Sequence, residues 1–231
     1  MDKQRRQFLL ASAAFGVTAL GPPGQVRGDD KKGEEEVSAT EDLMREHGVL
    51  NRILLIYEEG LRRIDKKEEV APAVFRDAAE LVRKFVEDYH EKLEENFIFP
   101  EFEKQKKLTD LVKVLRQQHG AGRGLTELIL RDAADDRFTK EDTRRELVTS
   151  CQAFIRMYRP HEAREDTVLF PALHKVMAPK QLKELGEQFE KEEDRLFGDE
   201  GFEKTVDRVA AIEKQLGIYD LAQFTPRAPA K

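Results

Sequence analysis

The chain has 231 residues, 37% of them charged, and a formal net charge of -6. Its length is enough for one well-packed domain or two small ones, and its charged, tryptophan-free composition suits a soluble, mainly helical protein. The negative charge argues against nucleic acid or an anionic membrane as a partner. Because Cys151 is the single cysteine, an intramolecular disulfide framework is excluded.

The amino terminus predicts export. Arg5 and Arg6 precede a mildly apolar run at residues 8–20, which is too short to span a bilayer comfortably. This arrangement resembles a twin-arginine export signal. The resemblance implies a signal peptide at residues 1–28, a periplasmic or exported protein without stable membrane insertion, and export after folding and cofactor loading. A basic segment leading an amphipathic or anchoring stretch is the alternative.

Four long stretches with apolar residues at helical spacing follow a linker at residues 29–37. The first opens with the capping-box sequence SATE, and the second has Pro72 in its first turn. Thr109 and Thr139 are expected to cap the third and fourth, and Pro160 should kink the fourth. The stretches cover residues 38–64, 72–97, 109–134 and 139–167.

Short turns join these stretches, which predicts an antiparallel up-down four-helix bundle over residues 38–177. Residues 178–222 are expected to add helical structure whose glutamate and lysine runs face solvent, and residues 223–231 form a tail. The predicted fold class is therefore all-α, an antiparallel up-down four-helix bundle with one or two extra C-terminal helices.

Four histidines and two glutamates share the apolar faces of the four predicted helices. In the second and fourth helices the glutamate follows the histidine by four residues, so both side chains point the same way. The six residues are His47, His90, Glu94, His119, His161 and Glu165.

The four histidines are also expected to lie at one height in the bundle. Level residues on two antiparallel helices are equally far from the turn that joins them, and each midpoint between successive histidines falls in or beside a turn. The third-helix histidine follows the first by 72 residues, and the fourth follows the second by 71. The second helix pair therefore repeats the first, which predicts a pseudo-two-fold axis through the site.

This cluster points to a metal. A buried glutamate without a partner is costly, and two beside four imidazoles are costlier. A bound cation removes that cost, and mixed histidine and carboxylate ligation suits two non-haem iron ions. We expect Glu94 and Glu165 to bridge the two ions. Ligand types alone do not exclude manganese or zinc.

A histidine on the first and third helices, with HxxxE on the second and fourth, resembles the hemerythrin-like, HHE cation-binding family over about residues 38–177. The resemblance implies that His47 and His90 hold one iron, and that His119 and His161 hold the other.

Two departures from the oxygen-carrying hemerythrins bear on function. Those proteins have a second histidine one turn after the third-helix ligand, where this chain has Arg123. Their last carboxylate is an aspartate at the spacing of Asp166, but Glu165 is preferred here because it matches Glu94 in the other half. The resemblance therefore implies a more symmetric site with open or water-filled metal positions, and favours redox or sensing chemistry over simple oxygen carriage.

Two further metal-site patterns fit the sequence less well. HExxE lacks the second histidine of a zincin helix, and the ferritin-like spacing of Glu87 and His90 has no second copy. Glu91 and Glu162 point about 100° away from the histidines and are expected outside the ligand set or on the surface. The remaining predictions are a surface or packing role for His174, a buried thiol at Cys151, core tyrosines at 57, 89 and 158, and helix bends or ends at the Phe-Pro pairs of Phe99 and Phe170.

The leading hypothesis is a binding protein, an exported di-iron bundle that binds or senses dioxygen or a related diatomic such as nitric oxide. The alternative is an enzyme that uses the same irons to reduce peroxide or nitric oxide or to oxidise Fe(II). A third hypothesis is a metal-free or iron-storing helical scaffold.

Overall fold

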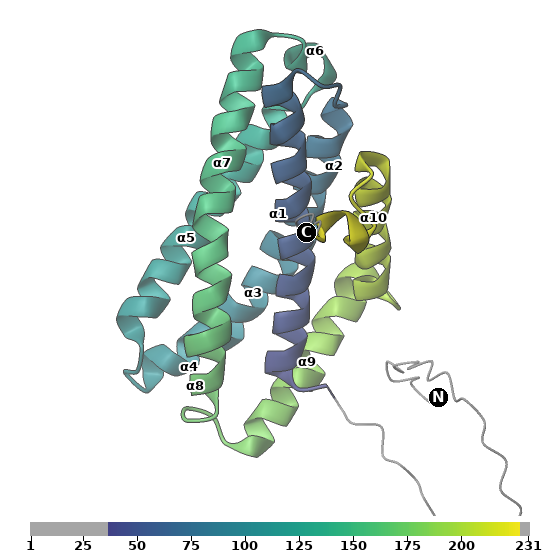
Figure 1. Cartoon of the computed structure of the whole chain (residues 1–231). Coiled ribbons are helices and arrows are strands. Elements are labelled where there is room, and N and C mark those ends of the chain that lie inside the picture. The colour runs from purple at the N-terminus through teal and green to yellow at the C-terminus, as the bar shows by residue number, and fades with distance from the viewer. Residues whose placement is uncertain (1–36, 227–231) are drawn as a thin grey trace, which may run out of the picture. The chain divides into compact units, whose positions relative to one another are not determined.

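The computed structural model describes residues 37–226, and this part of the chain is helical, with no β-strand (Figure 1). The predicted signal peptide at residues 1–28, residues 29–36 of the linker and residues 227–231 of the tail lie outside the described residues. No described helix combines the length and apolarity needed to cross a membrane. The predicted all-α class is confirmed.

The first helix, α1 (Ala39–Lys66), begins where the capping sequence predicted. Ser38 is the N-cap, and its hydroxyl accepts a hydrogen bond from the Glu41 N–H at 3.2 Å. The helix ends at Lys66, and the C-cap Lys67 has a left-handed conformation in which its N–H reaches the carbonyls of Arg63 and Ile64. The inward face of α1 is buried along its length and carries His47.

The second helical run is longer than predicted. It contains five segments, with Pro72 in the first turn as expected. The predicted end at Phe97 is wrong, because the helix passes the Phe-Pro pair through a π-helical turn whose carbonyl at Glu94 accepts from the Phe99 N–H. The segments are α2 (Pro72–Leu81), π-helical η1 (Val82–His90), α3 (Glu91–Leu93), π-helical η2 (Glu94–Ile98) and α4 (Phe99–Lys104).

The third and fourth helical runs are α5 (Thr109–Asp132) and α7 (Glu141–Arg164), joined by the short α6 (Asp135–Phe138). The predicted threonine caps are wrong. Leu108, in a left-handed conformation, and Lys140 hold the N-cap positions without side-chain hydrogen bonds, because the incoming chain turns one residue away from each expected cap.

The fourth run also extends beyond its predicted end at Thr167. After α7, which contains Pro160, it passes through π-helical η3 (Glu165–Leu169) into α8 (Phe170–Leu173). Neighbouring helices pack in four pairs, α1 with α2, α2 with α5, α5 with α7, and α7 with α1, which closes a helical bundle (Figure 1).

Two further helices, α9 (Pro179–Phe197) and α10 (Gly201–Leu216), pack against α1, and a 3₁₀ turn, η4 (Leu221–Phe224), follows. Arg52 on α1 donates two hydrogen bonds to Glu213 on α10, at 2.9 and 2.6 Å. The prediction that the charged runs face solvent is wrong for Glu193 and Glu213, which are buried because α1 and the start of α10 cover them. The extension therefore forms a layer on the side of α1.

Aromatic side chains fill the bundle core. Tyr57, Tyr89 and Tyr158 are buried as predicted, and the Tyr57 ring lies 5.7 Å from that of Phe154. Cys151 is also buried, and burial raises the pKa of its thiol, so it is a structural rather than a reactive cysteine. This packed core holds the ligand-bearing helices against one another.

Candidate metal centre

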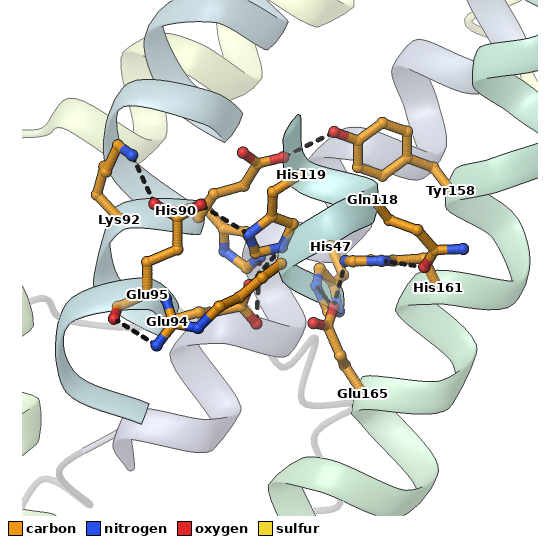
Figure 2. Close-up of polar contacts among 12 residues, drawn as sticks. His47, His90, Lys92, Glu94, Glu95, Gln118, His119, Tyr158, His161 and Glu165 are labelled. Atoms are coloured by element: carbon orange, nitrogen blue, oxygen red, sulfur yellow. Dashed lines mark hydrogen bonds and ion pairs between the residues drawn. The ribbon is translucent and has the colours of Figure 1, made fainter. Parts of the chain in front are cut away.

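The six side chains singled out by their spacing converge inside the bundle (Figure 2). None is more than 4% exposed to solvent. Their donor atoms form two overlapping clusters in which all atoms lie within 4.8 Å of one another. One cluster is Glu94, His119, His161 and Glu165, and the other is His47, His90 and Glu94.

The imidazoles form the two pairs that the family resemblance implied. The ring centroids of His47 and His90 lie 4.7 Å apart. Those of His119 and His161 lie 5.1 Å apart. The first pair combines α1 with the second helical run, and the second pair combines α5 with the fourth. The site is therefore built from four separate helical runs.

Each inner carboxylate faces one histidine from each pair. The two oxygens of Glu94 lie 3.9 Å from His90 Nε2 and 3.3 Å from His119 Nε2. One oxygen of Glu165 lies 3.4 Å from His47 Nε2 and 3.1 Å from His161 Nε2. Atoms that share a first-row metal ion at about 2.0–2.2 Å lie about 3 Å apart, a separation that the Glu165 and His161 atoms match and the Glu94 and His90 atoms exceed.

The outer nitrogen of every imidazole is hydrogen-bonded to a neighbouring side chain. With Nδ1–H donating, Nε2 is left as the free inward-facing atom, which is the tautomer needed to ligate a metal. The Nδ1–oxygen distances are 2.7 Å for His47 to Asp166, 2.7 Å for His90 to Glu46, 3.1 Å for His119 to Glu95 and 2.9 Å for His161 to Gln118.

The inner atoms, in contrast, have no satisfactory partner. Both oxygens of Glu94, both oxygens of Glu165 and Nε2 of His119 are buried and make no hydrogen bond of acceptable geometry with any described residue. Leaving such groups buried and unsatisfied costs on the order of 1–3 kcal/mol each, and more when they are charged. A cation bound between them would satisfy all of them at once, so the donor set fits a metal.

The charge states of the inner groups also favour a cation. Burial and the nearby charge of Glu165 raise the pKa of Glu94 well above its usual range. Burial opposes ionisation of Glu165 too, but His161 and His47 hold the pKa of that carboxyl below its usual range. Two carboxylates this close carry full charge together only beside a cation. Burial lowers the pKa of His119 to about 4, so its imidazole is neutral near pH 7 and available as a ligand.

The family described as the hemerythrin HHE cation binding domain matches residues 38–173, with an overlapping second match at residues 110–217. The chain belongs to this family. It is 48% identical over 231 residues to uncharacterized proteins of Mycobacterium bovis and of two Mycobacterium tuberculosis strains, CDC 1551 and H37Rv. The aligned region covers 96% of this chain and 91% of each relative. No solved structure matches the chain significantly.

The Phe-Pro pairs of this hemerythrin-like domain have a role that the sequence did not reveal. The Phe99 ring stacks on His119 at a centroid distance of 5.4 Å, and the Phe170 ring stacks on His47 at 5.5 Å. Each pair was expected to bend or end its helix, but both helices continue past it. The repetition of Phe-Pro in the two halves was the signal for a shared role in packing against the site.

Arg123 and its partners form a partly buried polar group beside the site. Arg123 donates to Glu91 at 2.7 Å and to Glu95 at 2.6 Å, and the Tyr158 hydroxyl donates to Glu91 at 2.7 Å. The guanidinium that stands in place of a hemerythrin histidine therefore pairs with carboxylates outside the inner ring. It supports His119 indirectly, through Glu95.

Glu91 and Glu162 stay outside the six-residue ring, as expected. Of the two positions predicted for them, they occupy the buried one, because helices pack over both. Glu162 accepts a hydrogen bond from Asn51. His174 is exposed, and Glu87 pairs with Arg83 at 3.0 Å. The residues that accept from the outer imidazole nitrogens recur in the two halves at the same step as the histidines. The sequence contains this pattern, but it could be interpreted only once the orientations of the helices were known.

Proposed function

We propose that the chain is an exported non-haem di-iron protein that binds or senses dioxygen or a related diatomic such as nitric oxide. One observation carries the proposal. Glu94 and Glu165 each lie between two histidine pairs, with buried oxygens that no described residue satisfies. Family membership supports a metal centre, and the donor set supports iron.

In the proposed centre, His47 and His90 would hold one ion, His119 and His161 would hold the other, and Glu94 and Glu165 would serve both. We also infer that the four helical runs form an antiparallel up-down bundle, because this arrangement puts the four histidines at one height. When bound, iron would supply electron exchange and an open position for a diatomic ligand.

The chain's own residues prepare this centre in three ways. The Nδ1–H hydrogen bonds fix the orientation of every imidazole. Phe99 and Phe170 pack on two of the rings, so they limit both ring rotation and water entry. Two imidazoles and two shared carboxylates supply few protein ligands per ion. This leaves room for a small ligand and favours binding or sensing.

The experiment isolates the full chain anaerobically from the exported fraction of its host and measures iron content and the absorbance spectrum before and after gas exchange. About two irons per chain and a charge-transfer band that appears with oxygen and reverses on its removal are expected. A chain confined to the cytoplasm would overturn the export proposal, and one purified without stoichiometric metal would indicate a scaffold. Steady consumption of a reductant with peroxide or nitric oxide would instead favour the enzyme.

The His119→Ala variant tests the ligand assignment within the same experiment. It should lose about one iron per chain and much of the visible spectrum, because each ion depends on few protein ligands. His174→Ala is the matched control, since His174 is exposed and lies outside the ring of six. Full iron retention in His119→Ala would count against the assignment.

A further inference from the structure

The two halves of the site are alike in their inner ring but differ in the residues that support it. Glu46 precedes His47, and Gln118 precedes His119, so the two occupy the same position in the repeat. Each accepts a hydrogen bond from the histidine of the neighbouring helix, His90 at 2.7 Å for Glu46 and His161 at 2.9 Å for Gln118. A carboxylate in one half is therefore replaced by a neutral amide in the other.

The remaining outer contacts increase this difference. Asp166 accepts from His47 at 2.7 Å, whereas Glu95 accepts from His119 at the longer distance of 3.1 Å. Glu95 is also shared, because it accepts from Arg123 at 2.6 Å and from Lys92 at 2.5 Å. Figure 2 shows Lys92, Glu95 and Gln118 around the His119 and His161 pair. The negative charge on Glu95 is thus partly neutralised by cations.

The partner of an imidazole Nδ1–H changes how strongly the opposite nitrogen donates to a metal. A carboxylate accepts a charge-assisted hydrogen bond and raises the basicity of the ring, whereas an amide oxygen does so less. A more basic imidazole binds a metal ion more tightly and stabilises its higher oxidation state. Both rings of the His47 and His90 pair have carboxylate partners, while the His119 and His161 pair has one carboxylate and one amide.

We propose that the two metal positions are unequal, and that Gln118, acting through His161, makes the His119 and His161 position the weaker-binding and more easily reduced of the two. The inference rests on the proposed function, because it assumes that two ions bind. Gln118 is a positioning residue here, because it bonds the outer nitrogen of His161, Nδ1, rather than an inward-facing donor atom.

The test titrates Fe(II) anaerobically into the metal-free full chain and follows binding by calorimetry, then follows stepwise reduction of the loaded chain by spectroelectrochemistry. The wild-type chain should bind its ions in two steps whose affinities differ by about 10- to 100-fold. Gln118→Glu should tighten the weaker step toward the stronger one and lower the potential of the more easily reduced ion. Glu46→Gln should weaken the tighter step by a similar factor, so the inference does not depend on one variant folding.

Gln117→Glu is the matched control, because Gln117 is the exposed neighbour of Gln118 and receives the same change of charge. It should leave both steps in place. Wild-type binding in one indistinguishable step, or equal effects of the changes at 117 and 118, would overturn the inference while two irons per chain still support the proposed function. A chain that takes up no second ion would overturn both.

Discussion

The hydroxyl of Tyr158 reaches Glu91 only because residue 122 is a glycine. A Cβ atom at Gly122 would lie 2.0 Å from the Tyr158 oxygen and 2.8 Å from the ring carbon that carries it. Tyr158 is buried among Phe154 and His161, with ring centroids 4.3 and 5.5 Å away. The missing side chain on α5 is therefore what allows the polar group beside the site to form.

Gly122→Ala should destabilise the metal-free chain by about 1–3 kcal/mol, because the tyrosine must move or the helices must separate. This effect opposes the gain of about 1 kcal/mol expected when alanine replaces glycine in a helix. Urea unfolding measures the difference. Gly124→Ala, on the same helix with nothing within 4 Å of the added carbon, should show only the gain. Equal stability changes in the two variants would contradict the account.

At the residue scale, helical spacing alone was enough to predict that the six inner residues lie together, because helical periodicity fixes which side chains face inward. It did not identify the supporting contacts of Glu46 or Gln118. Those contacts depend on how one helix is rotated against the next and on side-chain rotamers, neither of which a single helix encodes. The same limit explains why spacing left open whether Glu91 lies behind the ligands or on the surface.

The π-helical turns are the element-scale feature that shapes the site. η2 and η3 begin at Glu94 and Glu165, and in both the N–H five residues later, on Phe99 or Phe170, donates to the glutamate carbonyl. The following proline has no N–H and would crowd the carbonyl four residues earlier in a regular α-helix. A wider turn removes that conflict. The helix therefore continues past proline, where the sequence predicted it would bend or stop.

Pro100→Ala removes the cause of one wide turn and should let α-helical geometry compete, which would rotate Phe99, and its packing on His119, relative to Glu94. We expect iron affinity to fall by about tenfold, equivalent to about 1.4 kcal/mol, and to fall further in the double variant with Pro171→Ala. Competition with a chelator provides the measurement. Pro179→Ala, in the first turn of α9, is the control. Equal affinities in Pro100→Ala and this control would show that the prolines do not set the turns.

Across the whole molecule, buried ionisable groups tie the stability of the metal-free chain to pH. Burial raises the pKa of Glu162 from 4.5 to about 8 and, likewise, that of Glu91 to about 8. Between these values the folded carboxyl keeps a proton that the unfolded chain releases, so stability falls as pH rises from about 4.5 to 8. Burial lowers the pKa of His119 from 6.5 to about 4, so its contribution is lost as pH falls through that range. The two carboxyls outweigh the one histidine where these ranges overlap, so the stability that these three groups contribute should peak near pH 4.5.

Glu162→Gln should flatten the alkaline side of this profile. The wild-type chain should lose up to about 1.4 kcal/mol of unfolding free energy per pH unit from this group between pH 5 and 8, and the variant should not. Urea unfolding of the chelator-treated chain across that range tests the expectation. Glu187→Gln, at an exposed position on α9, should leave the slope unchanged. An unchanged slope in Glu162→Gln would mean that this carboxyl is already ionised in the folded chain.

The whole fold could be predicted only in part. Long apolar periodicities predicted four helical runs and the helical extension, because they record which faces are buried. The burial of Glu213 could not be predicted, since it depends on Arg52 of α1, 161 residues away in the chain. The third helix begins at Thr109 as predicted, but the N-caps at Leu108 and Lys140 were missed because backbone turns, rather than capping side chains, set them.

The six inner residues come from four helical runs, and none is more than 4% exposed. An ion in the proposed centre would therefore cross-link helices that are far apart in the sequence. No such ion could leave by simple diffusion from a surface. Exchange of the ion with the surroundings would be limited by how often the bundle opens. The centre would therefore retain for a long time the metal ion that it first bound.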